Sequence, residues 1–242
     1  NNLVPLPPHL FSHNSQTEHW HNMSPQTSTL DGWGGRMTED IDALGGVAGA
    51  AVGPLSQISL RGINAFQRGT TSLPYTVSPN GVTSFTGLNT SNTRNTRRLQ
   101  AFNELLDQKL SPAAGHLMEQ GYADVMRSTM NNATAIDAAL TAQGPLSTVF
   151  PSTSIGDQLS MVANLIGVRS TIGLNRQVFF VRMGGYDTHG SQVTRHTRLM
   201  TELSAGLSAF DAGMGELGLR DNVTTFTASE FGRTLTSNGD GT

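Results

Sequence analysis

Apolar residues along this chain of 242 residues change their spacing from one segment to the next, and each spacing predicts a type of element. In four segments between residues 97 and 217 they recur three or four positions apart, which is the period of an amphipathic helix. The predicted buried faces carry Leu99, Phe102, Leu105 and Leu106; Met118, Tyr122, Val125, Ile136 and Leu140; Leu159, Val162, Leu165 and Ile166; and Leu199, Leu203, Leu207, Phe210, Met214 and Leu217. The last helix is expected to end at Gly218, a favoured C-terminal cap.

Two shorter runs predict strands. Residues 177–183 (QVFFVRM) are almost continuously apolar, and residues 223–228 (VTTFTA) are β-branched and aromatic. With the helix between them they form a predicted βαβ unit over 177–234. A right-handed crossover makes such strands parallel, so both carboxyl ends lie at one edge of the sheet. Open α/β sheets bind their ligands at that edge.

The rest of the chain is less regular. Residues 1–40 show little periodicity, although residues 31–36 (DGWGGR) are typical of a turn that enters a helix. Residues 53–95 hold short apolar runs broken by Gly, Pro and Asn, which predict an inserted hairpin or a cap over a site. The chain closes on a loop composition, residues 238–242 (NGDGT). Only two strong strands are present, where α/β sheets usually have about five, so we expect the middle part of a larger protein.

Polar residues follow each predicted strand at its carboxyl end. Asp187 and His189 follow the first strand, and Glu230 and Arg233 follow the second. These side chains are therefore expected to converge. The structural alternatives are a solvated loop in which Asp187 caps the next helix, and a surface ion pair between Glu230 and Arg233.

Composition limits the chemistry. The chain has no cysteine, which excludes disulfides, thiolate nucleophiles and Cys-ligated metals. A metal site built from Asp, Glu and His suits zinc, manganese, magnesium or calcium. The net charge is −3 and the sequence pI is about 6.2, which gives no support to nucleic-acid binding. No apolar run has the length of a membrane span.

Four segments, taken in order, resemble the bacterial family of unknown function 1501: residues 6–20, 32–36, 184–189 and 225–239. That family is grouped with the alkaline phosphatase and sulfatase superfamily. The resemblance implies that residues 1–242 are a partial, incomplete domain of the α/β class. The implied fold is alkaline phosphatase-like, a mostly parallel sheet flanked by helices. It also implies twin-arginine export, and hence a periplasmic or secreted protein whose signal lies outside this chain.

The superfamily's chemistry uses two divalent cations and a hydroxyl nucleophile on a small anionic ester, a phosphate or a sulfate. By resemblance, Asp187 and His189 are ligands of one cation and Glu230 is a ligand of the other. Ser12 lies where the superfamily has its nucleophile, with His13 beside it as a further candidate ligand. Arg233 is expected to contact the substrate anion.

Two other functions are kept open. Phe231 stands where phosphatases have a ligand histidine, which favours a non-catalytic periplasmic or surface binding protein with the same fold. A serine hydrolase that uses Ser12 and a histidine would need no metal. Of the other histidines, His19 and His21 are candidate ligands or packing residues, and His196 is expected to be solvated.

Overall fold

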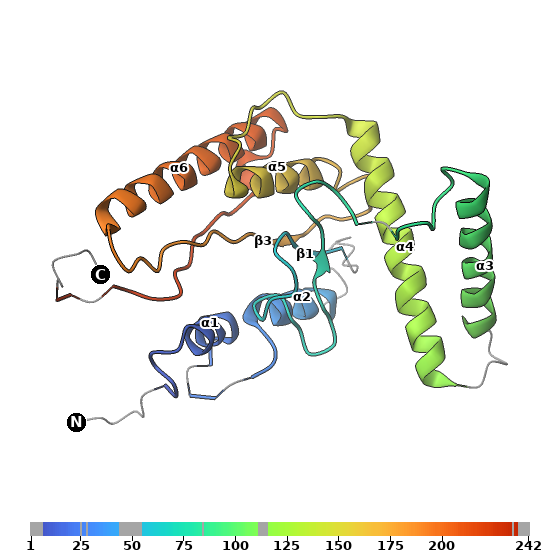
Figure 1. The fold of residues 1–242 in the computed structure, drawn as a ribbon, viewed down its shortest axis with the longest axis horizontal. Helices are drawn as coiled ribbons and strands as arrows, with labels where there is room; N and C mark the ends of the chain where they lie inside the picture. The colour runs from blue at the N-terminus through green and yellow to red at the C-terminus, as the bar shows by residue number, and fades with distance from the viewer. Residues whose placement is uncertain are drawn as a thin grey trace.

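The computed structural model describes residues 7–24, 26–27, 29–43, 55–83, 85–110, 116–233 and 235–236. Within these ranges the protein is of the α/β class, with six α-helices and a three-stranded parallel sheet (Figure 1). The predicted class is therefore confirmed. The strands are β1 (Gln57–Ser59), β2 (Tyr75–Thr76) and β3 (Val178–Phe180); the helices are α1 (His13–Asn22), α2 (Trp33–Ala43), α3 (Thr93–Leu110), α4 (Leu117–Gln143), α5 (Ser154–Gly167) and α6 (Gln192–Glu216), followed by the 3-10 helix η2 (Arg220–Asn222).

The sheet has the strand order β2-β1-β3, so the central strand comes from residues 53–95. Ile58 pairs with Tyr75 on one side and with Phe179 on the other, both in parallel register, and is fully buried. The hairpin considered for this region is therefore wrong, since β1 and β2 run parallel. The buried amide of Gln67 donates to the carbonyls of Ile58 (3.0 Å) and Val178 (2.8 Å), and so ties β1 to β3. Residues 53 and 54 lie outside the described ranges.

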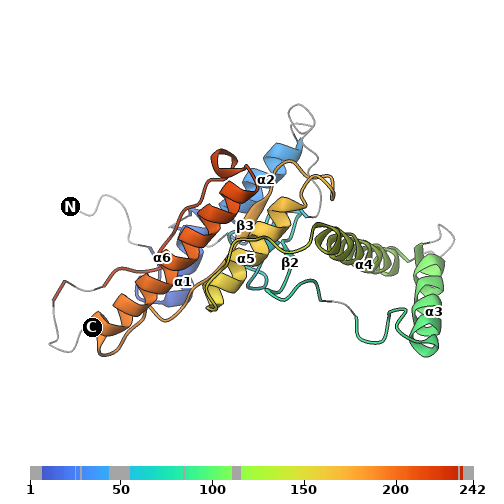
Figure 2. The ribbon, with the colours of Figure 1, turned by 90° about the horizontal axis from the view of Figure 1, so that it is seen from above.

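Helices cover both sides of the sheet. Helices α5 and α6 lie side by side on one side, and α1 and α2 lie on the other (Figures 1 and 2). The apolar stripe predicted for α5 is confirmed, because Leu159, Val162 and Leu165 are all buried in the core. On α6, Phe210 and Met214 are buried. The predicted cap is confirmed at Gly218, whose φ is +68°.

Helix α2 lies unusually close to the loop at residues 65–69. The amide of Gly32 donates to the carbonyl of Arg68 (2.7 Å), and the amide of Gly35 donates to that of Phe66 (3.0 Å). A Cβ on Gly35 would lie 2.3 Å from a backbone carbon of Arg68, and one on Gly34 would lie 2.6 Å from the Phe66 ring. The glycines of residues 32–35 are therefore required by this close backbone packing.

Helices α3 and α4 form a hairpin that extends away from the sheet (Figures 1 and 2). The prediction of buried positions holds in part, since Ile136 of α4 is fully buried and Leu106 of α3 is 3% exposed. Met118, Tyr122 and Val125 were expected to be buried but are 78%, 67% and 63% exposed. Helical periodicity identifies an apolar face, but it does not say whether another element covers that face.

The second strand of the predicted βαβ unit is not formed. Residues 223–229 belong to no helix or strand: in the described part of the chain they pair with no strand, and Thr224 to Ser229 are all exposed. A β-branched sequence becomes a strand only where a neighbouring strand and a covering layer are available. Residues 238–242, predicted to be a closing loop, lie outside the described ranges. No helix in those ranges is long and apolar enough to span a membrane.

Candidate functional site

The segment that leaves β3 is fixed at its start by one buried side chain. Gln158 of α5 is fully buried, accepts a hydrogen bond from the Arg182 amide (3.0 Å) and donates to the Arg182 carbonyl (3.1 Å). Farther along, His196 of α6 donates to the Tyr186 carbonyl (3.4 Å) and meets the Tyr186 ring edge-on. His196 is thus half-buried against this segment, and the expectation of a solvated residue is wrong. These contacts position Asp187 and His189.

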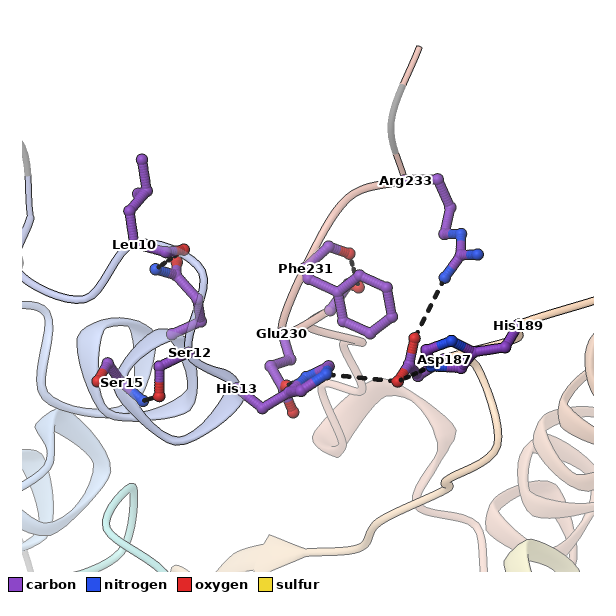
Figure 3. Close-up of polar contacts among 11 residues, drawn as sticks. Leu10, Ser12, His13, Ser15, Asp187, His189, Glu230, Phe231 and Arg233 are labelled. Carbon is purple, nitrogen blue, oxygen red and sulfur yellow. Dashed lines mark hydrogen bonds and ion pairs between the residues drawn. The ribbon is translucent and has the colours of Figure 1, made fainter. Parts of the chain in front are cut away.

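Helix α1, which its weak periodicity did not reveal, brings His13 to the same place. Ser12 is the N-cap residue, and its Oγ accepts a hydrogen bond from the Ser15 amide (3.4 Å). Such a hydroxyl satisfies one of the free amides of a helix start. His13 is the first helical residue, and its ring points away from the helix towards Asp187 and Glu230 (Figure 3).

His13 lies between two carboxylates. Its Nδ1 contacts the Glu230 Oε1 at short hydrogen-bond distance, and its Nε2 lies 3.4 Å from the Asp187 Oδ2. The same Asp187 oxygen accepts a hydrogen bond from His189 Nε2 (3.0 Å). Asp187, His189 and Glu230 therefore gather around His13, as Figure 3 shows. This cluster is assembled from α1, the segment after β3 and the segment after η2.

Hydrogen bonds and opposite charges within the cluster shift the pKa values of His13 and Asp187. The hydrogen bond to Glu230, supported by the negative charges of Glu230 and Asp187, raises the pKa of the His13 imidazole. The hydrogen bond from His189 lowers the pKa of the Asp187 carboxyl, with the charges of His13 and Arg233 adding to it. A neutral imidazole has one N–H, so an imidazole that faces two carboxylates gains by holding a second proton.

Arg233 and Phe231 support this arrangement from the other side. The Arg233 guanidinium donates to the Thr188 carbonyl (2.5 Å) and to the Asp187 Oδ1 (3.4 Å). Its charged carbon lies 5.8 Å from the centre of the Phe231 ring, and that ring meets His13 edge-on at 5.3 Å. In this arrangement Arg233 orients the Asp187 carboxylate, whereas the sequence suggested a contact with substrate.

The donor set has the chemistry of a site for a hard or borderline cation, with carboxylate oxygens and imidazole nitrogens. Among the residues that the structure describes, however, no three His, Asp or Glu side chains are arranged to hold one metal ion. The side chains of the cluster hydrogen-bond to one another. The predicted residues therefore meet, while their geometry is that of a proton-sharing network.

Sequence reasoning gave His13 a minor place, although it is the residue that links Asp187 to Glu230. Its position at the start of a capped helix could have been read from Ser12, a favoured N-cap type. The fully buried Thr188, whose Oγ1 has no hydrogen-bond partner among the described residues, was not singled out. His21 is buried between Trp20, Phe66 and Phe180, which is the packing role.

Comparison with known proteins adds one finding. Neither the curated proteins nor the solved structures contain a match to this chain. A family model matches residues 4–242, nearly the whole chain, and its description is protein of unknown function, DUF1501. The chain belongs to the DUF1501 family.

Proposed function

We propose that this protein is an exported, metal-dependent hydrolase of small phosphate or sulfate esters, built on an alkaline phosphatase-like fold. The observation that carries the proposal is the meeting of Asp187, His189 and Glu230 around His13, from three segments far apart in sequence. Side chains gathered in this way, with perturbed pKa values, are common where proton transfer or ion binding takes place.

Asp187 and His189 would hold one cation and Glu230 would be a ligand of a second, since their oxygen and nitrogen donors suit zinc, manganese, magnesium or calcium. A bound divalent cation would supply Lewis-acid stabilisation of the charge on the ester oxygens. His13 fits a proton-transfer role better than a ligand role, because both its nitrogens already face carboxylates.

The proposed roles of the other residues follow from their contacts. The His13 imidazolium holds a proton that can pass to a leaving oxygen, as a general acid does. Arg233 keeps the Asp187 carboxylate in place. Ser12 is the proposed nucleophile: its Oγ would form a bond to the phosphorus or sulfur while the bond to the leaving oxygen breaks, with the hydroxyl proton passing to solvent and the His13 proton passing to the leaving oxygen.

The test measures release of 4-nitrophenol from its phosphate and sulfate esters, together with metal content. We expect hydrolysis that stops in strong chelator and returns when a divalent cation is added. Asp187→Asn should lower both bound metal and kcat, the latter by at least about 100-fold. The matched control is Asp124→Asn, at an exposed position on α4 far from the cluster, which should change neither.

A non-catalytic binding protein is the second candidate. It is favoured by the hydrogen-bonded geometry of the cluster in the described part of the chain and by Phe231 at the position of a ligand histidine. This candidate predicts at most one bound cation and no turnover. Unchanged metal content in Asp187→Asn would reject the metal ligands assigned above.

A further inference from the structure

A cavity of about 480 Å3 lies directly beside the cluster. It is shallow and widely open to solvent, and its volume is in the range of small-molecule sites. The lining residues are Gln16, His19, Trp20, Met23, Trp33 and Glu230. Glu230 therefore belongs to both the cluster and the cavity, because its carboxylate contacts His13 and its side chain forms part of the cavity wall.

We infer that this cavity binds a polyhydroxylated ring, so that the ester substrate is the phosphate or sulfate of a sugar. The exposed parts of the two indoles offer rigid apolar surface, which suits the C–H faces of a sugar ring. Gln16 and Glu230 bring hydrogen-bonding groups to the same wall. The substrate class rests on the proposed function, whereas binding of the ring does not.

The polar groups on the wall keep hydrogen-bonding capacity. The Gln16 Nε2 donates to the Leu10 carbonyl (2.7 Å). The Oε1 of the same amide can accept a hydrogen bond from a ligand. The Glu230 carboxylate accepts from His13 at one oxygen and, with about four lone-pair sites, can accept further donors. Hydrogen-bond acceptors next to aromatic rings suit a sugar, because its hydroxyl groups are donors and its C–H faces are apolar.

Two other ligand classes fit less well. A quaternary ammonium would use the aromatic surface, but the Glu230 charge is already opposed by His13, which reduces its attraction for a second cation. A plain aromatic ring would cover the indoles, but it has no donor for Glu230 or Gln16. Each of these acceptors would then lose water without a new partner, which is unfavourable.

The location of the cavity connects the ring to the ester. Because Glu230 lines the cavity and also contacts His13, a ring against Trp20 and Trp33 lies close to His13. An ester group on an exocyclic oxygen of that ring can reach the cluster while the ring stays in the cavity. Substrate recognition and reaction would thus use adjacent parts of one surface.

The chain has two tryptophans and both line this cavity, so intrinsic fluorescence reports on it directly. The probes are glucose, galactose, mannose and N-acetylglucosamine with their 6-phosphates and 6-sulfates, compared with choline and phenol. We expect a saturable fluorescence change with at least one neutral sugar at up to about 50 mM. The corresponding ester should bind at least about 10-fold more tightly.

The variant Gln16→Met removes the amide and keeps the side-chain length. It should weaken sugar binding about 5-fold, the effect of one hydrogen bond, whereas Gln100→Met on the exposed face of α3 should leave it unchanged. The inference is overturned if no sugar changes the fluorescence, if choline or phenol binds and sugars do not, or if Gln16→Met binds sugar normally. Sugar binding without ester hydrolysis would reject the proposed hydrolase and retain the ring site; hydrolysis without sugar binding would do the reverse.

Discussion

Acidification from pH 7.5 to 5 should destabilise this protein through one buried histidine. His21 is 4% exposed and lies among Trp20, Phe66 and Phe180. Burial, with a smaller contribution from the charge of Arg182, lowers the pKa of its imidazole from 6.5 to about 4. The folded protein therefore keeps His21 neutral, while the unfolded chain protonates it below pH 6.5.

The size of the effect follows from these two pKa values. A base whose pKa is depressed in the fold contributes its full stability above the unfolded pKa and loses it as the pH falls. Between pH 6.5 and 4 the loss is about 1.4 kcal/mol per pH unit. At pH 5 the free energy of unfolding should be about 2 kcal/mol lower than at pH 7.5 on account of His21 alone.

The assay is urea unfolding at several pH values, followed by the fluorescence of the two tryptophans. The variant His21→Phe keeps a ring in the aromatic group and removes the titration, so it isolates the contribution of this residue from all others. The wild-type protein should lose about 2 kcal/mol more than the variant between pH 7.5 and 5. Parallel pH profiles for the two proteins would refute the reasoning.

Three further perturbations test the fold. Gly35→Ala places a Cβ 2.3 Å from backbone of the neighbouring loop and should cost about 3 kcal/mol or more in thermal unfolding; the control Gly121→Ala, where a Cβ meets nothing within 4 Å, should stabilise by about 0.5–1 kcal/mol. Glu39 accepts hydrogen bonds from three consecutive backbone amides, chiefly Thr71, which lower its pKa to about 2. Glu39→Gln should therefore cost about 1–2 kcal/mol at pH 7, allowing for solvent screening, and the difference should fade as the pH drops from about 4.5 to about 2. Gln158→Leu leaves backbone groups next to β3 unpaired and should lower the free energy of unfolding by about 2–3 kcal/mol at neutral pH; equal stability would contradict the role given to that amide.

Local periodicity predicted the elements that pack against the sheet. The α5 stripe was correct because that helix is covered on its apolar side by the sheet and α6, so its apolar face and its buried face coincide. The same reasoning failed for α4, where the apolar residues Met118 and Tyr122 lie on an uncovered part of the hairpin. Whether another element packs on an apolar face depends on the tertiary structure, and the periodicity of a single helix does not show it.

The sequence predicted most residues of the site, but it did not predict how the fold brings them together. Asp187 and Glu230 do come near each other, but through the imidazole of His13 and without a second paired strand. Residues 223–228 have strand composition, yet strand pairing depends on a partner elsewhere in the chain. The link between an N-terminal helix and two later segments is a contact over more than 170 positions, which no short motif contains.

Because the cluster draws on three distant segments, any molecule that bridges them also fastens the N-terminal helix to the rest of the protein. By mass action, such a molecule would reduce the population of states in which α1 is detached, even when the sheet and α5 remain intact. Protection of α1 from limited proteolysis would then serve as a measure of occupancy that requires no turnover.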